Sequence, residues 1–289
     1  MIKKIAPVCL LAFLVGVHVY ALNTQNSFEK LRVGTAQERS KAAVELGRKK
    51  NPEAIGALMA ALKDSSENVR GRAAEALGRI QDARAIDALI ETLKDKNAAV
   101  RAYAAEALGK IQDTKAVEAL IALLTDANAT AKRSAIEALA AIKDTRATDQ
   151  LITCLKDSDE AIRKFSIDAL ARIKDTKAVE PIIESLKDTS AAIRAKAATA
   201  LGELGDARAL KPLTEALSDK YKDVRASATE ALGKLNDTHA VEALQKMLAD
   251  EHKNVRDNAK KAIAQLTGKT PEEKKEPAST GTNTNLELK

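Results

Sequence analysis

The sequence predicts an all-α protein, a right-handed α-solenoid of stacked αα-hairpins, and three observations lead to this fold class. The stretch from Val69, VRGRAAEALGRIQDARAIDALIETLKD, recurs 31 residues later from Val100 as VRAYAAEALGKIQDTKAVEALIALLTD. Each such unit holds two helical patterns of about a dozen residues joined by short turns, as in an αα-hairpin. Aromatic residues make up only 2% of the chain and Trp is absent, so we expect a core of small aliphatic layers. A fixed period of this length indicates layers that share their apolar faces.

Residues 1–21 are typical of a secretory signal peptide. They contain Lys3 and Lys4, then an apolar run, and they end in the small-residue pattern VYA. An uncleaved membrane anchor is the alternative, although the run is shorter than the ~20 apolar residues of a spanning helix and contains Pro7. We therefore expect export, to the periplasm or the extracellular space of a bacterium.

The rest of the chain divides into three regions. Residues 22–50 are expected to form an N-terminal lead and a capping half-repeat, because residues 35–49 resemble the second half of a repeat. Residues 51–267 hold seven repeats of 31 residues, the first with helices over roughly 52–63 and 68–80. Residues 268–289 are a tail rich in Thr, Lys, Glu and Pro, which is too polar to fold.

Equivalent positions of the repeats form columns whose composition indicates packing. The first helices carry leucine or isoleucine from Leu58 to Leu244 in one column and leucine from Leu62 to Leu248 four residues later. This apolar stripe needs a neighbouring hairpin to cover it. A column near the end of the second helix holds Gly47, Gly78, Gly109, Gly202 and Gly233, but also Ala140, Ala171 and Ala264. Alanine is penalised at positive φ, so this column is predicted to need a small side chain for close packing.

Polar residues before each helix are predicted to act as N-caps. Aspartates from Asp82 to Asp237 precede the first helices, and Ser66, Asn97, Asn128, Asp159 and Ser190 precede the second. Two prolines, Pro181 and Pro212, fall inside the first-helix pattern, so these two helices are expected to start late or to kink.

An aspartate followed six residues later by an arginine recurs in six of the seven units. Each charge is disfavoured by the helix dipole at its position, so we predict that the two pair in a ladder of charge-assisted hydrogen bonds that links the layers. Replacing Asp157 with Ala should then lower the melting temperature. The pairs are Asp64–Arg70, Asp95–Arg101, Asp157–Arg163, Asp188–Arg194, Asp219–Arg225 and Asp250–Arg256.

Charge and composition exclude several partners. The formal charge is +6 and falls to +4 without Lys3 and Lys4, with acids and bases interspersed, which gives no case for nucleic-acid binding. We expect no membrane contact beyond the signal peptide. We also expect the protein to be a monomer.

The repeats resemble HEAT repeats, specifically the short class named after phycobilisome lyases. The patterns (Val/Ile)-Arg-x-x-Ala-Ala-x-Ala-Leu-Gly-x-Ile and Asp-x-(Arg/Lys)-Ala-(Val/Ile)-x-x-Leu match across the seven units. In the third unit Ala131-Lys132 replaces Val-Arg, which puts the continuity of the ladder in doubt there. The resemblance implies a fold in which second helices line the inner face, but it barely constrains function, because the class includes chromophore lyases, a di-iron hydroxylase and plain scaffolds.

No catalytic, metal-binding or cofactor-binding residue is predicted. The di-iron hydroxylase of this class needs several His-Glu pairs, and here no His is followed by Glu. His239 and His252 fall in columns of turn and capping residues. Cys154 shares a column with Ala, Thr, Leu, Ser and Met, so we interpret it as a packing residue.

The candidate protein-binding surface is the exposed side of the second helices. Tyr103 and Phe165 fall in one column that we predict to face solvent, and aromatic residues are preferred anchors in protein interfaces. The alternative is isolated surface aromatics without a function. The candidate binding residues are Arg72, Tyr103, Arg133, Ser134, Lys164, Phe165 and Lys196.

These observations lead to one expected function and one alternative. We expect an exported, non-enzymatic scaffold or assembly factor that binds another protein or peptide along its concave face. The alternative is a chromophore lyase or chaperone-like enzyme, as in the class that the repeats resemble.

Overall fold

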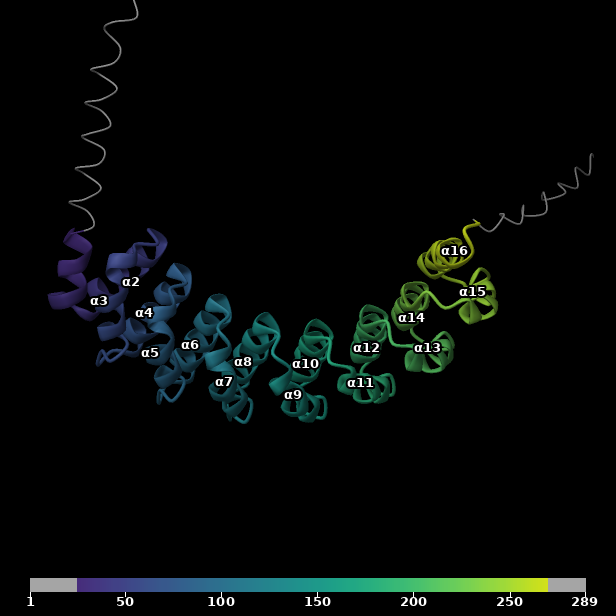
Figure 1. Cartoon of the computed structure of the whole chain (residues 1–289), viewed down its shortest axis with the longest axis horizontal. Helices are drawn as coiled ribbons and strands as arrows, with labels where there is room; N and C mark the ends of the chain where they lie inside the picture. The colour runs from purple at the N-terminus through teal and green to yellow at the C-terminus, as the bar shows by residue number, and fades with distance from the viewer. Residues whose placement is uncertain (1–24, 270–289) are drawn as a thin grey trace, which may run out of the picture.

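The computed structural model describes residues 25–269, in which helices stack into an open arc (Figure 1). The predicted signal peptide and almost all of the predicted polar tail lie outside these residues. Every helix in the described part is too short or too polar to cross a bilayer.

Seven hairpins follow one another along the arc, as predicted. The second helix of each hairpin lies on the inner side of the arc, and the first helix lies on the outer side (Figure 1). The second helices are α4 (Glu67–Ile80), α6 (Ala98–Ile111), α8 (Ala129–Ile142), α10 (Glu160–Ile173), α12 (Ala191–Leu204), α14 (Lys222–Leu235) and α16 (Lys253–Thr267).

Each first helix is a one-turn 3₁₀ segment that continues into a short α-helix. From Asp82 to Asp237, the aspartate before each 3₁₀ turn accepts a hydrogen bond from the main-chain N–H two residues later, so the predicted caps are confirmed; Asn51 does the same in the first hairpin. The 3₁₀ segments are η2 (Pro52–Ala54), η3 (Ala83–Ala85), η4 (Thr114–Ala116), η5 (Thr145–Ala147), η6 (Thr176–Ala178), η7 (Ala207–Ala209) and η8 (Thr238–Ala240). The α-helices are α3 (Ile55–Ala61), α5 (Ile86–Thr92), α7 (Val117–Leu123), α9 (Thr148–Cys154), α11 (Val179–Ser185), α13 (Leu210–Ala216) and α15 (Val241–Met247).

Pro181 and Pro212 do not delay their helices, so the predicted late start is wrong. The helices α11 and α13 begin at the same position of the repeat as those without proline. Each proline falls in the first turn of its α-helix, where a main-chain N–H is not required for the intrahelical ladder.

The N-terminal cap is a complete hairpin rather than the predicted half-repeat. Residues 25–33 form a helix, and α2 (Ala36–Arg48) packs against α4 as a second helix would. Thr35 and Glu38 form a capping box that starts α2. The helix over 25–33 was missed because it does not follow the period of the repeats.

The caps of the second helices agree with the prediction in position and partly in chemistry. Asn97, Asn128 and Asp159 accept hydrogen bonds from main-chain N–H groups of their helices, whereas the Ser66 and Ser190 side chains make no such bond. At the C-terminal end of each second helix from α4 to α14, the capping residue has a left-handed backbone conformation. At Gln81 and Gln112 the side chain also donates to a main-chain oxygen of the next second helix.

The apolar columns form one continuous core between the layers. Leu58, Leu89, Leu120 and Leu151 are all fully buried, and neighbouring hairpins share them as the period predicts. The glycine column makes the closest approach between second helices: a Cβ added at Gly78 would lie 2.6 Å from the Cα of Ala107. Its glycines are not the left-handed residues, so the prediction that this column serves close packing is confirmed.

Candidate functional site

A ladder of ion pairs runs along one edge of the stack and fixes the positions of the inner helices. Arg70 donates to the two carboxylate oxygens of Asp95 over 2.6 and 2.9 Å, and also to the main-chain oxygen of Asp64 over 2.9 Å. Each arginine of the repeats thus joins the turn of its own hairpin to the next hairpin. The pairs within residues 25–269 are Arg39–Asp64, Arg70–Asp95, Arg101–Asp126, Lys132–Asp157, Arg163–Asp188, Arg194–Asp219 and Arg225–Asp250.

The ladder links the layers as predicted, but the predicted pairing of carboxylates with bases is wrong. Five arginines bond the carboxylate of the aspartate 25 residues later and reach only the main-chain oxygen of the aspartate six residues earlier: Arg70, Arg101, Arg163, Arg194 and Arg225. The reason is that each carboxylate turns toward the preceding layer and also accepts a main-chain N–H of its own turn, as Asp95 does from Asn97 over 2.8 Å. The pairs that do not form are Asp64–Arg70, Asp95–Arg101, Asp157–Arg163, Asp188–Arg194, Asp219–Arg225 and Asp250–Arg256.

The ladder differs from the prediction at its two ends and at Lys132, where a lysine replaces the arginine. Arg39 of the cap extends the ladder by one pair at the N-terminal end. Arg256 donates only to main-chain oxygens, because no further layer follows it in the described residues. Lys132 contacts Asp157 over 2.6 Å, so the ladder is continuous through the third unit, with one donor atom in place of the guanidinium fork.

The ladder residues are partly buried and stay charged at neutral pH. Hydrogen bonds from Arg101 hold the pKa of Asp126 below its ordinary value, although partial burial acts in the opposite direction. The bond to Asp126 in turn raises the pKa of Arg101. The charges of the ladder bond one another, so we interpret the ladder as a structural feature that holds the layers together.

The inner wall of the arc carries the predicted binding residues, but their main column does not face solvent. Tyr103 of α6 is half-buried and leans on α4, where a Cβ at Gly71 would lie 3.0 Å from its ring. The Arg72 guanidinium lies 5.5 Å from the centre of the same ring. Ser134 of α8 is only 1% exposed and donates to Glu106 over 3.4 Å. This column faces the flank of the preceding helix, which explains why its members are covered.

The remaining predicted binding residues lie around α10. Phe165 is half-buried, and the Arg133 guanidinium of α8 lies 5.6 Å from its ring centre. Lys164 is exposed, and Lys196 of α12 forms an ion pair with Asp168. Tyr103 and Phe165 lie on helices separated by α8, so each aromatic ring is stacked by its own arginine instead of forming one shared cluster.

The exposed surface of the inner wall is lined by charged side chains. Glu75 pairs with Arg79 over 2.6 Å and Glu230 with Lys234 over 2.8 Å, within their own helices. The bases of the middle helices, such as Lys110 and Arg172, are exposed. The wall is thus a curved face lined mainly by charged side chains, several of them exposed, with little apolar surface.

Groups that support covalent or metal chemistry are not gathered on this wall. Cys154 is buried, and burial raises the pKa of its thiol. His239 pairs with Asp237 over 2.7 Å in an exposed turn, and His252 contacts Arg225 over 3.3 Å at the ladder edge. Within residues 25–269 no three His, Cys, Asp or Glu side chains are arranged to hold a metal ion.

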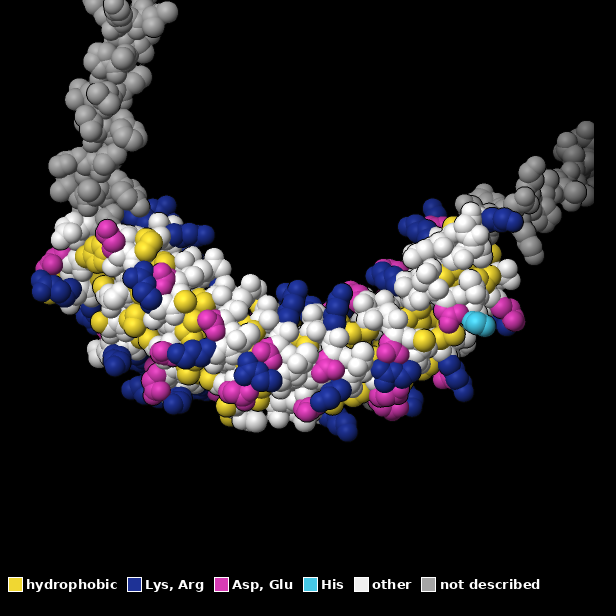
Figure 2. Space-filling model, in the orientation of Figure 1, with side chains coloured by type: hydrophobic (Ala, Val, Ile, Leu, Met, Phe, Trp, Pro, Cys, Tyr) yellow, Lys and Arg dark blue, Asp and Glu magenta, His cyan; other side chains and the backbone are white. Residues whose placement is uncertain are grey.

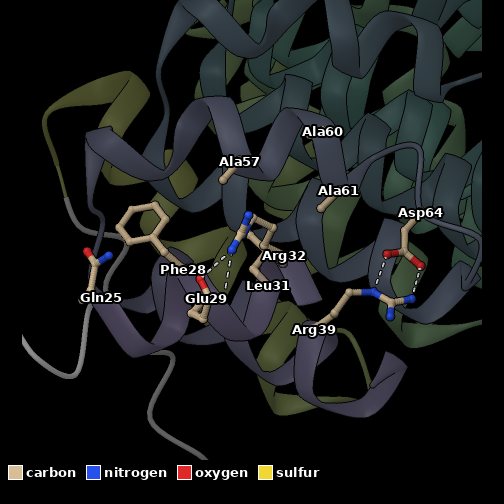
Figure 3. Close-up of a pocket in the computed structure, with 10 residues that line it drawn as sticks. All are labelled: Gln25, Phe28, Glu29, Leu31, Arg32, Arg39, Ala57, Ala60, Ala61 and Asp64. Atoms are coloured by element: carbon tan, nitrogen blue, oxygen red, sulfur yellow. Dashed lines mark hydrogen bonds and ion pairs between the residues drawn. The ribbon is translucent and has the colours of Figure 1, made fainter. Parts of the chain in front are cut away.

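A hollow lies at the N-terminal cap, away from the middle of the wall. It has a volume of about 650 Å³ and lies between the helix over 25–33 and α3. Figure 3 shows Phe28 at one end, the Arg39–Asp64 pair at the other, and Ala57 and Ala61 between them. This groove was not predicted from the sequence, because the helix that forms one side of it has no equivalent in the repeats.

Sequence comparison finds one family along the described chain. The family model described as HEAT repeats matches residues 29–100, 86–165, 148–233 and 210–276. No curated protein matches the sequence.

Solved structures share the architecture at low sequence identity. YibA of Escherichia coli is 24% identical with a TM-score of 0.62, over 86% of this chain and 96% of that one. An engineered protein is also 24% identical with a TM-score of 0.56, over 88% of this chain and 80% of that one. Kap95p, solved in a complex with RanGDP, is 15% identical with a TM-score of 0.63, over 84% of this chain and 39% of that one. These similarities establish a solenoid fold.

Proposed function

This chain belongs to the HEAT-repeat family, and from that premise we propose that it is a non-enzymatic scaffold that binds a segment of another protein along its inner wall. The observation that carries the proposal is the composition of that wall. Side chains such as Glu137, Lys164 and Arg172 are exposed there and take no part in the packing between layers. A long curved face of this kind suits an extended or convex partner.

The stability of the scaffold does not depend on these exposed residues. The core and the ladder hold the layers together through other columns, so the wall is free to contact a partner. Kap95p, which shares the fold, is bound to RanGDP, and this supports protein binding as a use of the fold by analogy alone.

We further propose that the protein is exported and works as a monomer. The basic start, apolar run and VYA pattern of residues 1–21 support export. The lone cysteine of the remaining chain, Cys154, is buried, which suits an oxidising compartment because it is protected from forming a disulfide with another molecule.

The proposal is tested by blocking the inner wall with a bulky side chain. Glu137 lies on α8 at the inner wall and Glu118 lies on α7 at the outer side, and both are exposed. Glu137→Trp and Glu118→Trp therefore make the same change of charge and size on opposite faces. Each tagged variant and the wild type would be purified from the source cells, and the co-purifying proteins would be quantified by mass spectrometry.

We expect a protein that co-purifies with the wild type and with Glu118→Trp. This protein should be lost with Glu137→Trp. Retention in both variants, or loss only with Glu118→Trp, would contradict binding by the inner wall. Co-purification of a pigment with the wild type would favour the chromophore lyase instead.

A further inference from the structure

We propose that the middle of the inner wall binds an extended, acidic segment of a partner protein, with carboxylates spaced about three residues apart. The inference rests on the proposed function and names the chemistry of the partner. The side chains that would bind it are Lys110, Arg133, Lys164 and Arg172, which belong to α6, α8 and α10.

These four bases carry charge that the protein does not neutralise. All four are exposed, and within residues 25–269 none lies within 4.0 Å of a carboxylate oxygen. Figure 2 shows Lys and Arg side chains projecting into the hollow from the middle of the arc. On the same three helices three acids have no basic partner, against four such bases: Glu106, which is half-buried and bonds Ser134, Glu137, and Glu160 at the start of α10. The middle of the wall therefore has an excess of positive charge.

Packing between layers explains why these bases are left without acids. Arg133 is followed four residues later by Glu137, which would ordinarily pair with it, but its guanidinium is stacked over Phe165 of the next layer. Asp168 lies four residues before Arg172, but it pairs with Lys196 of the next layer. Glu75 and Glu230, toward the two ends of the arc, keep their intrahelical partners. These contacts between layers leave Arg133 and Arg172 without an acidic partner on their own helices.

The spacing of the layers sets the spacing of the ligand groups. Packed helices lie about 8–10 Å apart. A chain in the polyproline II conformation has three residues per turn and advances about 3.1 Å per residue, so every third side chain lies on one face and meets the next layer. Arg133 and Lys164 occupy the same position of neighbouring repeats, so they match two carboxylates three residues apart. A segment with glutamate at every third position fits the wall better than one with the same glutamates adjacent to one another.

The test measures the binding of synthetic peptides to the full chain by fluorescence anisotropy. The probe is a labelled 15-residue peptide of Glu-Ser-Gly repeats, and the controls carry Gln for Glu or the same residues with the glutamates clustered. The inner variant combines Arg133→Glu with Lys164→Glu. The matched variant combines Lys156→Glu with Lys211→Glu, which are exposed bases that follow α9 and lie on α13 at the outer side. Circular dichroism verifies that both variants are folded.

The inner variant should bind the spaced peptide at least tenfold more weakly than the wild type, and the matched variant should bind it within about twofold. Equal binding of the Glu and Gln peptides, equal binding of the clustered peptide, or equal loss in both variants would overturn the inference. If the pull-down still identifies a partner that needs the inner wall, and the bound segment is basic or neutral, the proposed function stands and only the acidic ligand is wrong.

Discussion

Single side chains stabilise the turns of this molecule because each one forms several hydrogen bonds. Asp95 accepts the two hydrogen bonds of Arg70 and one main-chain N–H, and Arg70 also donates to the main-chain oxygen of Asp64. The side chains of Arg70 and Asp95 are 7% and 10% exposed, so loss of either partner leaves a charge that water reaches poorly. This geometry explains why an aspartate is favoured at a helix C-terminus in spite of the helix dipole.

Breaking one pair of the ladder should lower the free energy of unfolding, and the loss should be larger where an arginine loses two hydrogen bonds than where a lysine loses one. Asp126→Ala leaves Arg101 without its carboxylate, which should cost about 1–3 kcal/mol of unfolding free energy. Asp157→Ala should cost less, because Lys132 makes a single contact there. Lys132→Arg should add about 0.5–1.5 kcal/mol by restoring the fork. Urea unfolding of the three variants measures these differences, and equal stability of all three with the wild type would contradict the structural role of the ladder.

Acid should destabilise the fold through the aspartates of the ladder and through those that cap the first helices. Their pKa values are lowered in the folded chain, as for Asp126 by Arg101, and to about 2 for Asp82 and Asp206 by Arg84 and Arg208. The unfolded chain therefore binds protons first as the pH falls, so the stability is complete above the unfolded value of about 4 and is lost below it. Melting temperatures between about pH 6 and pH 2.5 should fall steeply below about pH 4. Asp126→Asn should show a shallower fall, and identical pH profiles for the two proteins would contradict this origin.

The sequence predicted the residues of the ladder but could not decide which residues pair. An arginine has one aspartate six residues before it and another 25 residues after it, and these two aspartates are one period of 31 residues apart. The same sequence pattern therefore contains both pairings. The choice depends on the distance between layers, which the pattern of residue types does not encode.

At the scale of the helices, the distance between neighbouring second helices is set by one column of small residues. Gly47, Gly78, Gly109 and Gly202 each bring a helix against an alanine of the next layer. The junctions α8–α10 and α10–α12, where Ala140 and Ala171 replace glycine, are the least closely packed of those between second helices. The sequence predicted the need for small side chains. It could not predict that the Tyr103 column faces a neighbouring helix, because that depends on how each helix is rotated against the previous layer.

Two glycine substitutions should have opposite effects on stability. Gly78→Ala adds a Cβ 2.6 Å from the main chain of Ala107, so the layers must move apart at a cost of about 1–3 kcal/mol. Gly56→Ala in α3 adds a Cβ with nothing within 4 Å, so it should stabilise the chain by about 0.5–1 kcal/mol through helix propensity. Urea unfolding measures both variants, and a neutral Gly78→Ala would contradict the packing role of this column.

At the scale of the whole molecule, each hairpin of residues 25–269 packs mainly against its neighbours, and the arc has no single centre (Figure 1). The period, the number of repeats and the shared core were predictable because the chain compares its own repeats internally. The cap helix over residues 25–33 and the groove beside it were not, because they occur once and have no period.

Removal of one complete repeat should leave a folded, shorter arc. Deletion of residues 127–157 joins Asp126 to Ser158 in the phase of the repeat, so Arg101 keeps its partner and the layers stay in register. The ellipticity per residue should be unchanged and the melting temperature should fall only modestly. Deletion of residues 127–141 alone removes most of a second helix and should abolish cooperative unfolding. Equal damage by both deletions would contradict a modular stack.

The most direct test of the central claim is site-specific photo-crosslinking in the source cells. A photoreactive amino acid would replace Lys164 on the inner wall in one variant and Lys211 on the outer side in another, both of which are exposed. We predict a crosslinked protein partner at position 164 and none at position 211. Crosslinks at 211 alone would contradict a scaffold that holds its partner within the arc.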